Sequence, residues 1–165
     1  MNNGYVKIAA ATPKIVIGDC GHNKSEIAKM TEDAYKNGAQ LIVFPELCIT
    51  GYTASDLFWQ KNMLDLAFEK INELAKDTKD MEIVSVVGAP IRHKNKLYNC
   101  GVVIYAGEIK AGCSLSYSPM RIQMSRPVCI PLNTNIPFVI ILYKFKLLLL
   151  YLLFFFQFIG LKRMS

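Results

Sequence analysis

One carboxylate in this chain stands where it could act as a general base. Glu46 follows Pro45 at the end of the apolar run Leu41–Phe44, and Leu47–Ile49 continue apolar after it. An ionised carboxylate is costly to bury among apolar residues, so Glu46 needs a polar partner or a raised pKa. A carboxyl group with a raised pKa is suited to taking up and returning a proton. The alternative is that Glu46 is only the first exposed residue after a strand.

The elements that must position Glu46 are predicted from the spacing of apolar residues. Leu41–Phe44 predicts a buried strand, which Pro45 ends because proline has no N–H to donate to a sheet. Helices are expected from Asn23, as an N-cap with Glu26 in a capping box, to Gly38, and over Asn62–Asp77. Further strands are expected at Val6–Ala11, Ile83–Val87, Leu97–Tyr105 and Glu108–Ala111. This alternation favours an α/β fold with helices covering one face of a sheet.

The segment 41–58, LIVFPELCITGYTASDLF, resembles the signature of the carbon–nitrogen hydrolase (nitrilase) superfamily. Its second half, GYTASDLF, is similar to the form found in the glutaminase domain of glutamine-dependent NAD synthetases. The resemblance extends to KIAAATPKI near the N-terminus and to LYNCGVVIY, and so covers roughly residues 4–110. It implies a four-layer αββα sandwich, of which a chain of this length would form a part.

The resemblance also implies a chemistry based on glutamate, lysine and cysteine. A cysteine thiolate attacks the side-chain amide of glutamine, the glutamate moves the proton, and the lysine stabilises the oxyanion. Glu46 matches the glutamate by its place in FPEL. Tyr52, in TGY, matches a tyrosine that lines the glutamine pocket, although a packed aromatic near a turn is an equally good interpretation of its spacing.

Two members of that catalytic set have no match in this sequence. Aligning Tyr117 and Pro119 with the family's string puts Leu115 at the position of the lysine, and leucine cannot donate to an oxyanion. The family's nucleophile string is absent, and neither Cys113 nor Cys129 is followed by glutamate. Cys48 lies two residues from Glu46, but nothing in the sequence places it within reach. We therefore assign no nucleophile and expect the chain to be inactive alone.

Charge and cysteine content narrow the classes of function. All thirteen acidic residues lie in residues 1–112, together with thirteen of the nineteen basic ones, so the net charge of +6 belongs to the remainder. Residues 1–112 contain no basic patch with interleaved aromatic residues, so the sequence does not indicate nucleic-acid binding. The five cysteines show no CxxC pair and no zinc-ligand spacing, which favours a reducing compartment without disulfides or metal. The N-terminus shows no signal-peptide pattern, so we expect a cytoplasmic location.

The sequence changes character after Gly112. We divide it into residues 1–112, the hydrolase-like part, and residues 113–165, a basic and apolar tail unlike the family. Lys144 and Lys146 interrupt the apolar stretch 137–161, which leaves fifteen uninterrupted residues where a membrane span needs about 20. A marginal transmembrane segment at 137–161 is one interpretation and would make the protein membrane-associated. We favour the other, translation of a non-coding or frame-shifted stretch.

Three hypotheses of function follow. The first is the N-terminal part of a glutaminase domain that releases ammonia for ATP-dependent amidation of deamido-NAD, in a family whose intact members form homo-oligomers. This segment would hold no cofactor, because ATP and deamido-NAD would bind the synthetase domain. The second is part of another nitrilase-like amidase. The third is a non-catalytic nitrilase-like module that the apolar tail tethers to a membrane.

Overall fold

The computed structural model describes residues 6–54, 60–93, 96–114 and 129–130, all within the first compact unit of the chain, Met1–Asn133. The tail predicted to diverge from the family, including the stretch 137–161, lies outside the described residues except at 113–114 and 129–130. Neither helix in the described part of the chain has the length and hydropathy needed to cross a bilayer.

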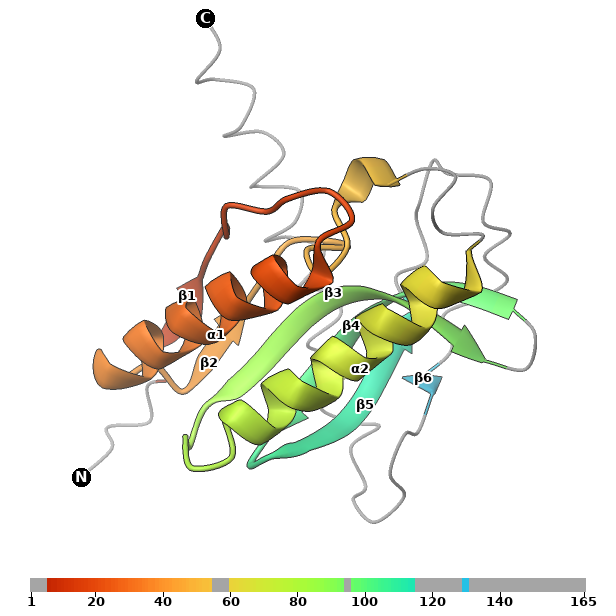
Figure 1. Ribbon diagram of the computed structural model, residues 1–165. Helices are drawn as coiled ribbons and strands as arrows, with labels where there is room; N and C mark the ends of the chain where they lie inside the picture. Colours follow the sequence, from red (N-terminus) through yellow and green to blue (C-terminus); the bar gives the residue numbers. More distant parts are fainter. Residues whose placement is uncertain (1–5, 55–59, 94–95, 115–128, 131–165) are drawn as a thin grey trace, which may run out of the picture. The chain divides into compact units, whose positions relative to one another are not determined.

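Six strands form one mixed sheet in the order β1-β2-β3-β4-β5-β6 (Figure 1). The strands β1, β2 and β3 pair in parallel, and β3 to β6 pair antiparallel. Their bounds are β1 Ile8–Ala10, β2 Leu41–Val43, β3 Val84–His93, β4 Lys96–Tyr105, β5 Glu108–Ser114 and β6 Cys129–Ile130. The predicted strands are confirmed, and the hairpin of β4 and β5 turns through Ala106 and Gly107, both at positive φ. The short strand β6 was not predicted.

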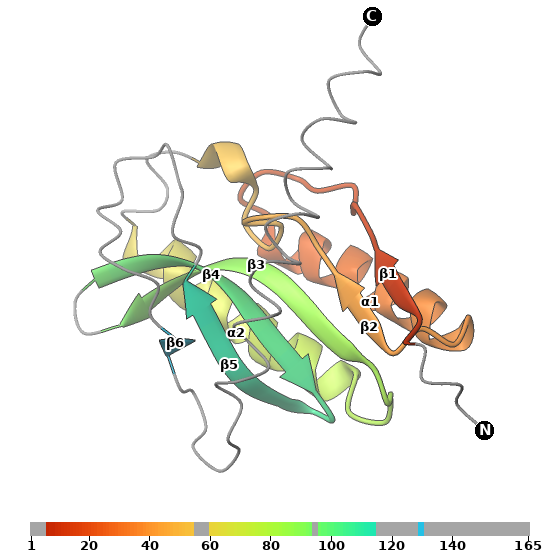
Figure 2. The same cartoon turned by 180° about the vertical axis from the view of Figure 1, so that it is seen from behind.

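Two helices, α1 (Cys20–Lys36) and α2 (Lys61–Asp77), lie on the same face of the sheet. Figure 1 shows them in front of the strands, and Figure 2 shows the sheet from behind. An ion pair joins the two helices, with Lys24 Nζ 2.5 Å from a carboxylate oxygen of Asp77. One sheet with one helix layer is the αβ half of an αββα sandwich, so the predicted α/β class and partial nitrilase-like sandwich are confirmed.

The predicted start of α1 is wrong. The helix begins at Cys20, and its N-cap is Asp19, whose side chain accepts a hydrogen bond of 2.9 Å from the backbone N–H of His22. Asn23 lies inside the first turn and is completely buried. Gly38 closes the helix at φ 76°, as predicted, with its N–H bonded to Tyr35 O at 2.8 Å. A local capping pattern was therefore overridden by contacts that Asn23 makes elsewhere in the fold.

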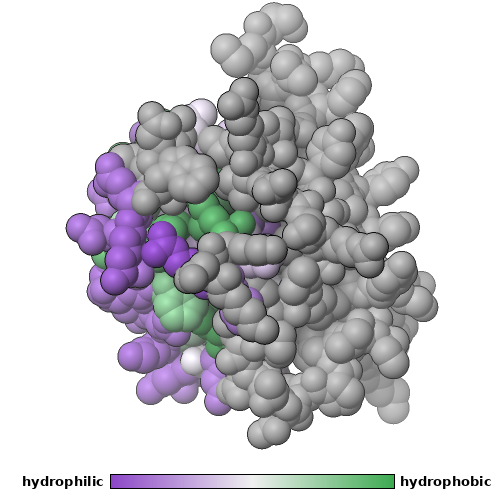
Figure 3. All heavy atoms as spheres, turned by 90° about the vertical axis from the view of Figure 1, so that its right-hand side faces the viewer, coloured by the Kyte–Doolittle hydropathy of each residue, from purple (hydrophilic) through white to green (hydrophobic). Residues whose placement is uncertain are grey.

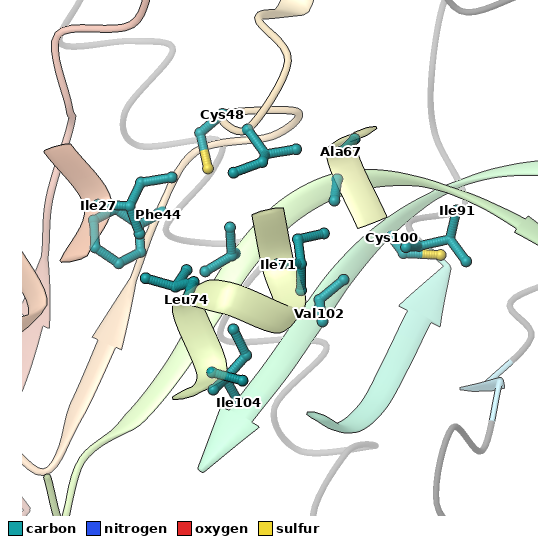
Figure 4. Close-up of a cluster of buried hydrophobic side chains, with 14 of the residues drawn as sticks. Ile27, Phe44, Cys48, Ala67, Ile71, Leu74, Ile91, Cys100, Val102 and Ile104 are labelled. Atoms are coloured by element: carbon teal, nitrogen blue, oxygen red, sulfur yellow. The ribbon is translucent and has the colours of Figure 1, made fainter. Parts of the chain in front are cut away.

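The hydrophobic core fills the space between the helix layer and the sheet (Figure 4). Ile71 and Leu74 of α2 pack there with Val102 and Ile104 of β4, and Ile27 brings in α1. Complete burial of such a side chain stabilises the fold by about 1.5–3 kcal/mol. In contrast, the described surface seen in Figure 3 is largely hydrophilic around a small apolar area. The core thus fixes β2, β3 and β4 side by side and with them the loop that leaves β2.

Candidate active site

The loop after β2 begins with a tight turn that contains Glu46. Phe44 N donates to Val86 O at 2.9 Å, and Pro45 then ends the pairing with β3. The backbone N–H groups of Thr50 and Gly51 both bond to Leu47 O, at 3.1 and 2.8 Å. Leu47 has φ 51°, in the left-handed region that a side chain such as leucine rarely adopts. Strained residues of this kind cluster at functional sites, and this one directly follows the candidate base.

Gly88 in β3 allows this turn to lie against the sheet. A Cβ atom at position 88 would be 2.5 Å from Leu47 N and 2.8 Å from the carbonyl carbon of Glu46, and closer still to Pro45 O. The carbonyl oxygen of Gly88 accepts a hydrogen bond from Ile49 N at 3.3 Å. The Sγ of Cys48 donates to the same oxygen at 3.6 Å. The turn is therefore hydrogen-bonded to β3 at Gly88, and only a glycine there allows the two backbones to lie so close together.

Asn23 of α1 fixes the far end of the turn. Its Nδ2 donates to Val16 O at 2.8 Å and to Ile49 O at 3.1 Å, and its Oδ1 accepts from Val16 N at 2.7 Å. A further backbone bond of 2.8 Å joins Gly18 N to Thr50 O. Asn23 is completely buried, and its bond to Ile49 O is shielded from competing water. The loop before α1 and the turn that contains Glu46 are thus held together as one unit.

The carboxyl group of Glu46 is partly buried and is hydrogen-bonded to an asparagine of β4. Asn99, only 1% exposed, donates from Nδ2 to Glu46 Oε1. Burial raises the pKa of Glu46 above its ordinary value, and the bond from Asn99 opposes part of that rise. No ion pair to Glu46 is found among residues 6–54, 60–93 and 97–112. The site therefore holds a carboxyl group that can exchange a proton and has an amide rather than a cation as its partner.

The described cysteines do not have the features of a nucleophile. Cys20, Cys48 and Cys100 are completely buried, and none of them forms a disulfide bond. Desolvation raises the pKa of Cys48 to about 12, so its thiolate is negligible near neutrality. Burial, and then the nearby charge of Asp19, also raise the pKa of Cys20, whose Sγ lies 3.7 Å from Met63 Sδ. Proximity in sequence to Glu46 therefore does not make Cys48 reactive.

Tyr52, the predicted pocket residue, lies close to the turn. It is partly buried and packs with Leu97 against a small cluster of Leu47 and Ala54. The structure therefore brings Tyr52 next to the residue that follows Glu46, and its role toward a substrate stays a prediction. Leu115 and the side chains of Cys113 and Cys129 lie outside the described part of the chain. In that part, no group of three or more His, Cys, Asp or Glu side chains could hold a metal ion.

Sequence reasoning missed two residues of this site, Asn99 and Gly88. Each had a signal in the sequence, because an asparagine in LYNCGVVIY interrupts an apolar strand and a glycine in VSVVGAP weakens one. A polar residue in a buried strand needs a partner, and a glycine there marks a close approach of another backbone. Neither signal tells which other segment of the chain makes the contact, and only the folded structure shows that it is the turn that contains Glu46.

The αβ layer carries a hydrogen-bonded carboxylate just beyond its buried parallel strand β2, as the resemblance of segment 41–58 to enzymes that cleave carbon–nitrogen bonds implies. The chain belongs to the carbon-nitrogen hydrolase family, whose model matches residues 7–114.

Its curated relatives include glutamine-dependent NAD(+) synthetases. The glutamine-dependent NAD(+) synthetase of Mycobacterium bovis is 37% identical over 117 residues, which are 71% of this chain and 17% of that protein. The human protein of the same description is 33% identical over 81 residues, or 49% of this chain and 12% of that protein. The chain thus spans less than a fifth of the length of these relatives.

Solved structures give the same fold. A glutamine-dependent NAD(+) synthetase from Cytophaga hutchinsonii aligns with a TM-score of 0.64 at 28% identity, covering 68% of this chain and 19% of the other. An amidase from Nesterenkonia sp. aligns with a TM-score of 0.58 at 25% identity, covering 69% of this chain and 44% of the other.

Proposed function

We propose that this chain supplies the general base, Glu46, of a site that hydrolyses the side-chain amide of glutamine for NAD synthesis. The observation that carries the proposal is the Glu46 carboxyl group, which is partly buried, has a raised pKa and is bonded to Asn99. The substrate is suggested by the two curated relatives and by the structure from Cytophaga hutchinsonii, which are all described as glutamine-dependent NAD(+) synthetases.

Glu46 would act twice in this reaction. It first takes the proton of a cysteine thiol while the sulfur attacks the amide carbon, and it then gives that proton to the departing ammonia as the C–N bond breaks. A water molecule next loses a proton to Glu46 as it attacks the thioester, and the thiol is restored when that proton returns to sulfur. A carboxyl group with a raised pKa suits both directions of transfer better than an ordinary one, because it takes up a proton more readily and can still give it back.

The remaining roles would come partly from this chain and partly from elsewhere. Tyr52 would line the glutamine pocket beside the turn. No nucleophilic cysteine and no oxyanion-stabilising lysine is assigned to this chain. ATP and deamido-NAD would bind a synthetase domain that the family resemblance implies and not this segment. Glutamine hydrolysis would thus need parts that correspond to the four-fifths or more of the relatives that this chain does not span.

A chimaera tests the role of Glu46 directly. Residues 7–114 of this chain would replace the matching segment of the Mycobacterium bovis relative, with and without Glu46→Gln. Glutamine keeps the shape and an acceptor oxygen for Asn99 but cannot take up a proton. We expect Glu46→Gln to abolish NAD synthesis from glutamine and to leave synthesis from added ammonia unchanged. Equal glutamine-supported rates in both chimaeras would refute the proposal, and the ammonia-supported rate shows that the protein is folded.

The chain by itself should release no ammonia from glutamine above the background rate. The assay compares the purified chain with its Glu46→Gln variant at equal concentration, with ammonia as the readout. Robust turnover that Glu46→Gln abolishes would show that the chain holds a complete catalytic set, contrary to our proposal.

The likeness to the Nesterenkonia amidase favours a second candidate, hydrolysis of a small amide rather than glutamine. The same chimaera distinguishes the two, because its segment 7–114 contributes the Tyr52 side of the pocket. Preference for short aliphatic amides over glutamine would favour the amidase. Preference for glutamine would favour the glutaminase.

A further inference from the structure

We propose that Asn99 is a positioning residue that serves both protonation states of Glu46, donating to the carboxylate and, after its amide turns over, accepting from the carboxylic acid. This proposal rests on the proposed role of Glu46 as a base. It goes beyond that role because it gives the proton-transfer site a second residue and a stated motion.

The first argument is the place of Asn99 in the sheet. It lies in β4 between Tyr98 and Cys100, both buried, and its neighbour across the sheet is Pro90 of β3. An amide side chain buried among such residues is destabilising unless it is hydrogen-bonded. Its one hydrogen bond in the described part of the chain goes to Glu46 Oε1. The partner of Asn99 is therefore the candidate base itself.

The second argument is the unpaired end of the amide. Asn99 Oδ1 is buried and has no hydrogen-bond partner among the described residues. If Oδ1 of Asn99 accepted a bond from the backbone, the amide would be held in one orientation. Asn23 is held in this way, because its Oδ1 accepts one backbone bond and its Nδ2 donates two. Asn99 loses no bond of Oδ1 when the amide rotates by a half-turn about its Cβ–Cγ bond. The amide is thus able to exchange the positions of Nδ2 and Oδ1.

The third argument is the chemistry of the base. An ionised carboxylate only accepts hydrogen bonds, whereas a protonated one also donates. When the proton is on Oε1, the oxygen of Glu46 that faces Asn99, the O–H needs an acceptor at the place where Nδ2 of Asn99 donated before. The half-turn brings Oδ1 to that place, so the carboxyl group keeps its orientation throughout the proton transfer. A lysine or arginine in place of Asn99 could donate to Glu46 but could not accept from its O–H.

The test is a nuclear magnetic resonance titration of the full chain. The side-chain carboxyl carbon of Glu46 is assigned by its loss in Glu46→Gln, and the side-chain amide of Asn99 by its loss in Asn99→Leu. We expect the amide nitrogen and protons of Asn99 to shift with the same midpoint as the Glu46 carboxyl. Asn99 resonances that stay constant through the Glu46 titration would overturn the proposal, and the titration itself is followed in the unaltered protein.

Variants supply the second measurement. Asn99→Leu, of similar volume, removes both the donor and the acceptor. It should move the Glu46 midpoint upward, because the charge-assisted bond to the carboxylate is stronger than the bond from the neutral acid. Ser85→Ala is the matched control, since Ser85 Oγ is the other buried and unpartnered side-chain atom in the described residues. It should leave the midpoint unchanged. No shift in Asn99→Leu, or the same shift in both variants, would refute the proposal.

The chimaera separates this proposal from the proposed function. There, Asn99→Leu should shift the acid limb of the pH–rate profile for glutamine upward and leave the ammonia-supported rate unchanged. If Glu46→Gln has no effect on glutamine use, the proposed function fails, whatever the titration shows. If Glu46→Gln abolishes glutamine use while the Asn99 amide is insensitive to Glu46, only the present proposal fails.

Discussion

Gly88→Ala should force the turn that contains Glu46 away from β3. The added Cβ would lie 2.5 Å from Leu47 N and 2.8 Å from the carbonyl carbon of Glu46. Both atoms belong to the backbone, so neither can yield by a rotamer change. The turn itself must therefore move outward.

The expected loss of stability has two parts. Overpacking of a close-packed site costs about 1–3 kcal/mol. Separation of the turn from the strand also breaks the bond of 3.3 Å from Ile49 N to Gly88 O, which contributes about 0.5–1.5 kcal/mol. Together these give a decrease of about 1.5–4.5 kcal/mol in the free energy of unfolding. The same movement exposes the carboxyl group to water, so the pKa of Glu46 should fall toward its ordinary value.

Urea unfolding of the full chain, followed by circular dichroism, measures the first effect, and a carboxyl titration measures the second. Gly21→Ala is the matched control, because a Cβ at that helical position meets only Asp19 Oδ1, at an ordinary 3.5 Å. Its stability should stay the same or increase by up to about 1 kcal/mol. A Gly88→Ala protein as stable as the Gly21→Ala protein, with an unchanged Glu46 midpoint, would refute the close approach.

Three further substitutions or labelling experiments follow from the same site. The raised pKa of Glu46 means that the native state binds the proton more tightly than the unfolded state, so the unaltered chain loses stability as pH rises from the unfolded to the folded pKa. Glu46→Gln lacks this loss and should therefore become more stable than the unaltered chain as pH rises. Urea midpoints at about pH 4 and about pH 8 measure the difference, and a change in the opposite sense would contradict this. Cys48, with a pKa of about 12, should resist iodoacetamide in the native chain and react in urea, as peptide mass mapping would show. Asn23→Ala should lower the free energy of unfolding by about 2–4 kcal/mol, since it leaves one buried and two partly buried backbone groups unpaired. Asn72→Ala removes only a solvent-exposed bond to Phe68 O and should change it by less than about 0.5 kcal/mol.

The parts of the site that follow from local sequence were predicted, and those that depend on contacts between distant segments were not. The run LIVF followed by Pro45 is sufficient to place a buried strand and a carboxylate just beyond it. Asn99 is 53 positions away from Glu46, and only the register of β3 against β4 brings it to the carboxyl group. For Asn99 a long-range contact was missed, whereas for Asn23 a local signal led to a wrong prediction. Its capping pattern is a valid local signal, but a completely buried amide with three bonds to the neighbouring loops prevails over it.

The distribution of unfavourable features argues that the turn serves a reaction rather than the fold. Leu47 adopts a left-handed backbone conformation, Glu46 is partly desolvated, and Asn99 keeps a buried oxygen without a described partner. Each feature alone costs about 1–3 kcal/mol and occurs in ordinary proteins. Their meeting at one carboxyl group is harder to explain by stability, because a structural carboxylate would be exposed or paired with a cation. A base that must gain and lose a proton in a fixed orientation requires this combination of burial, held geometry and an uncharged partner.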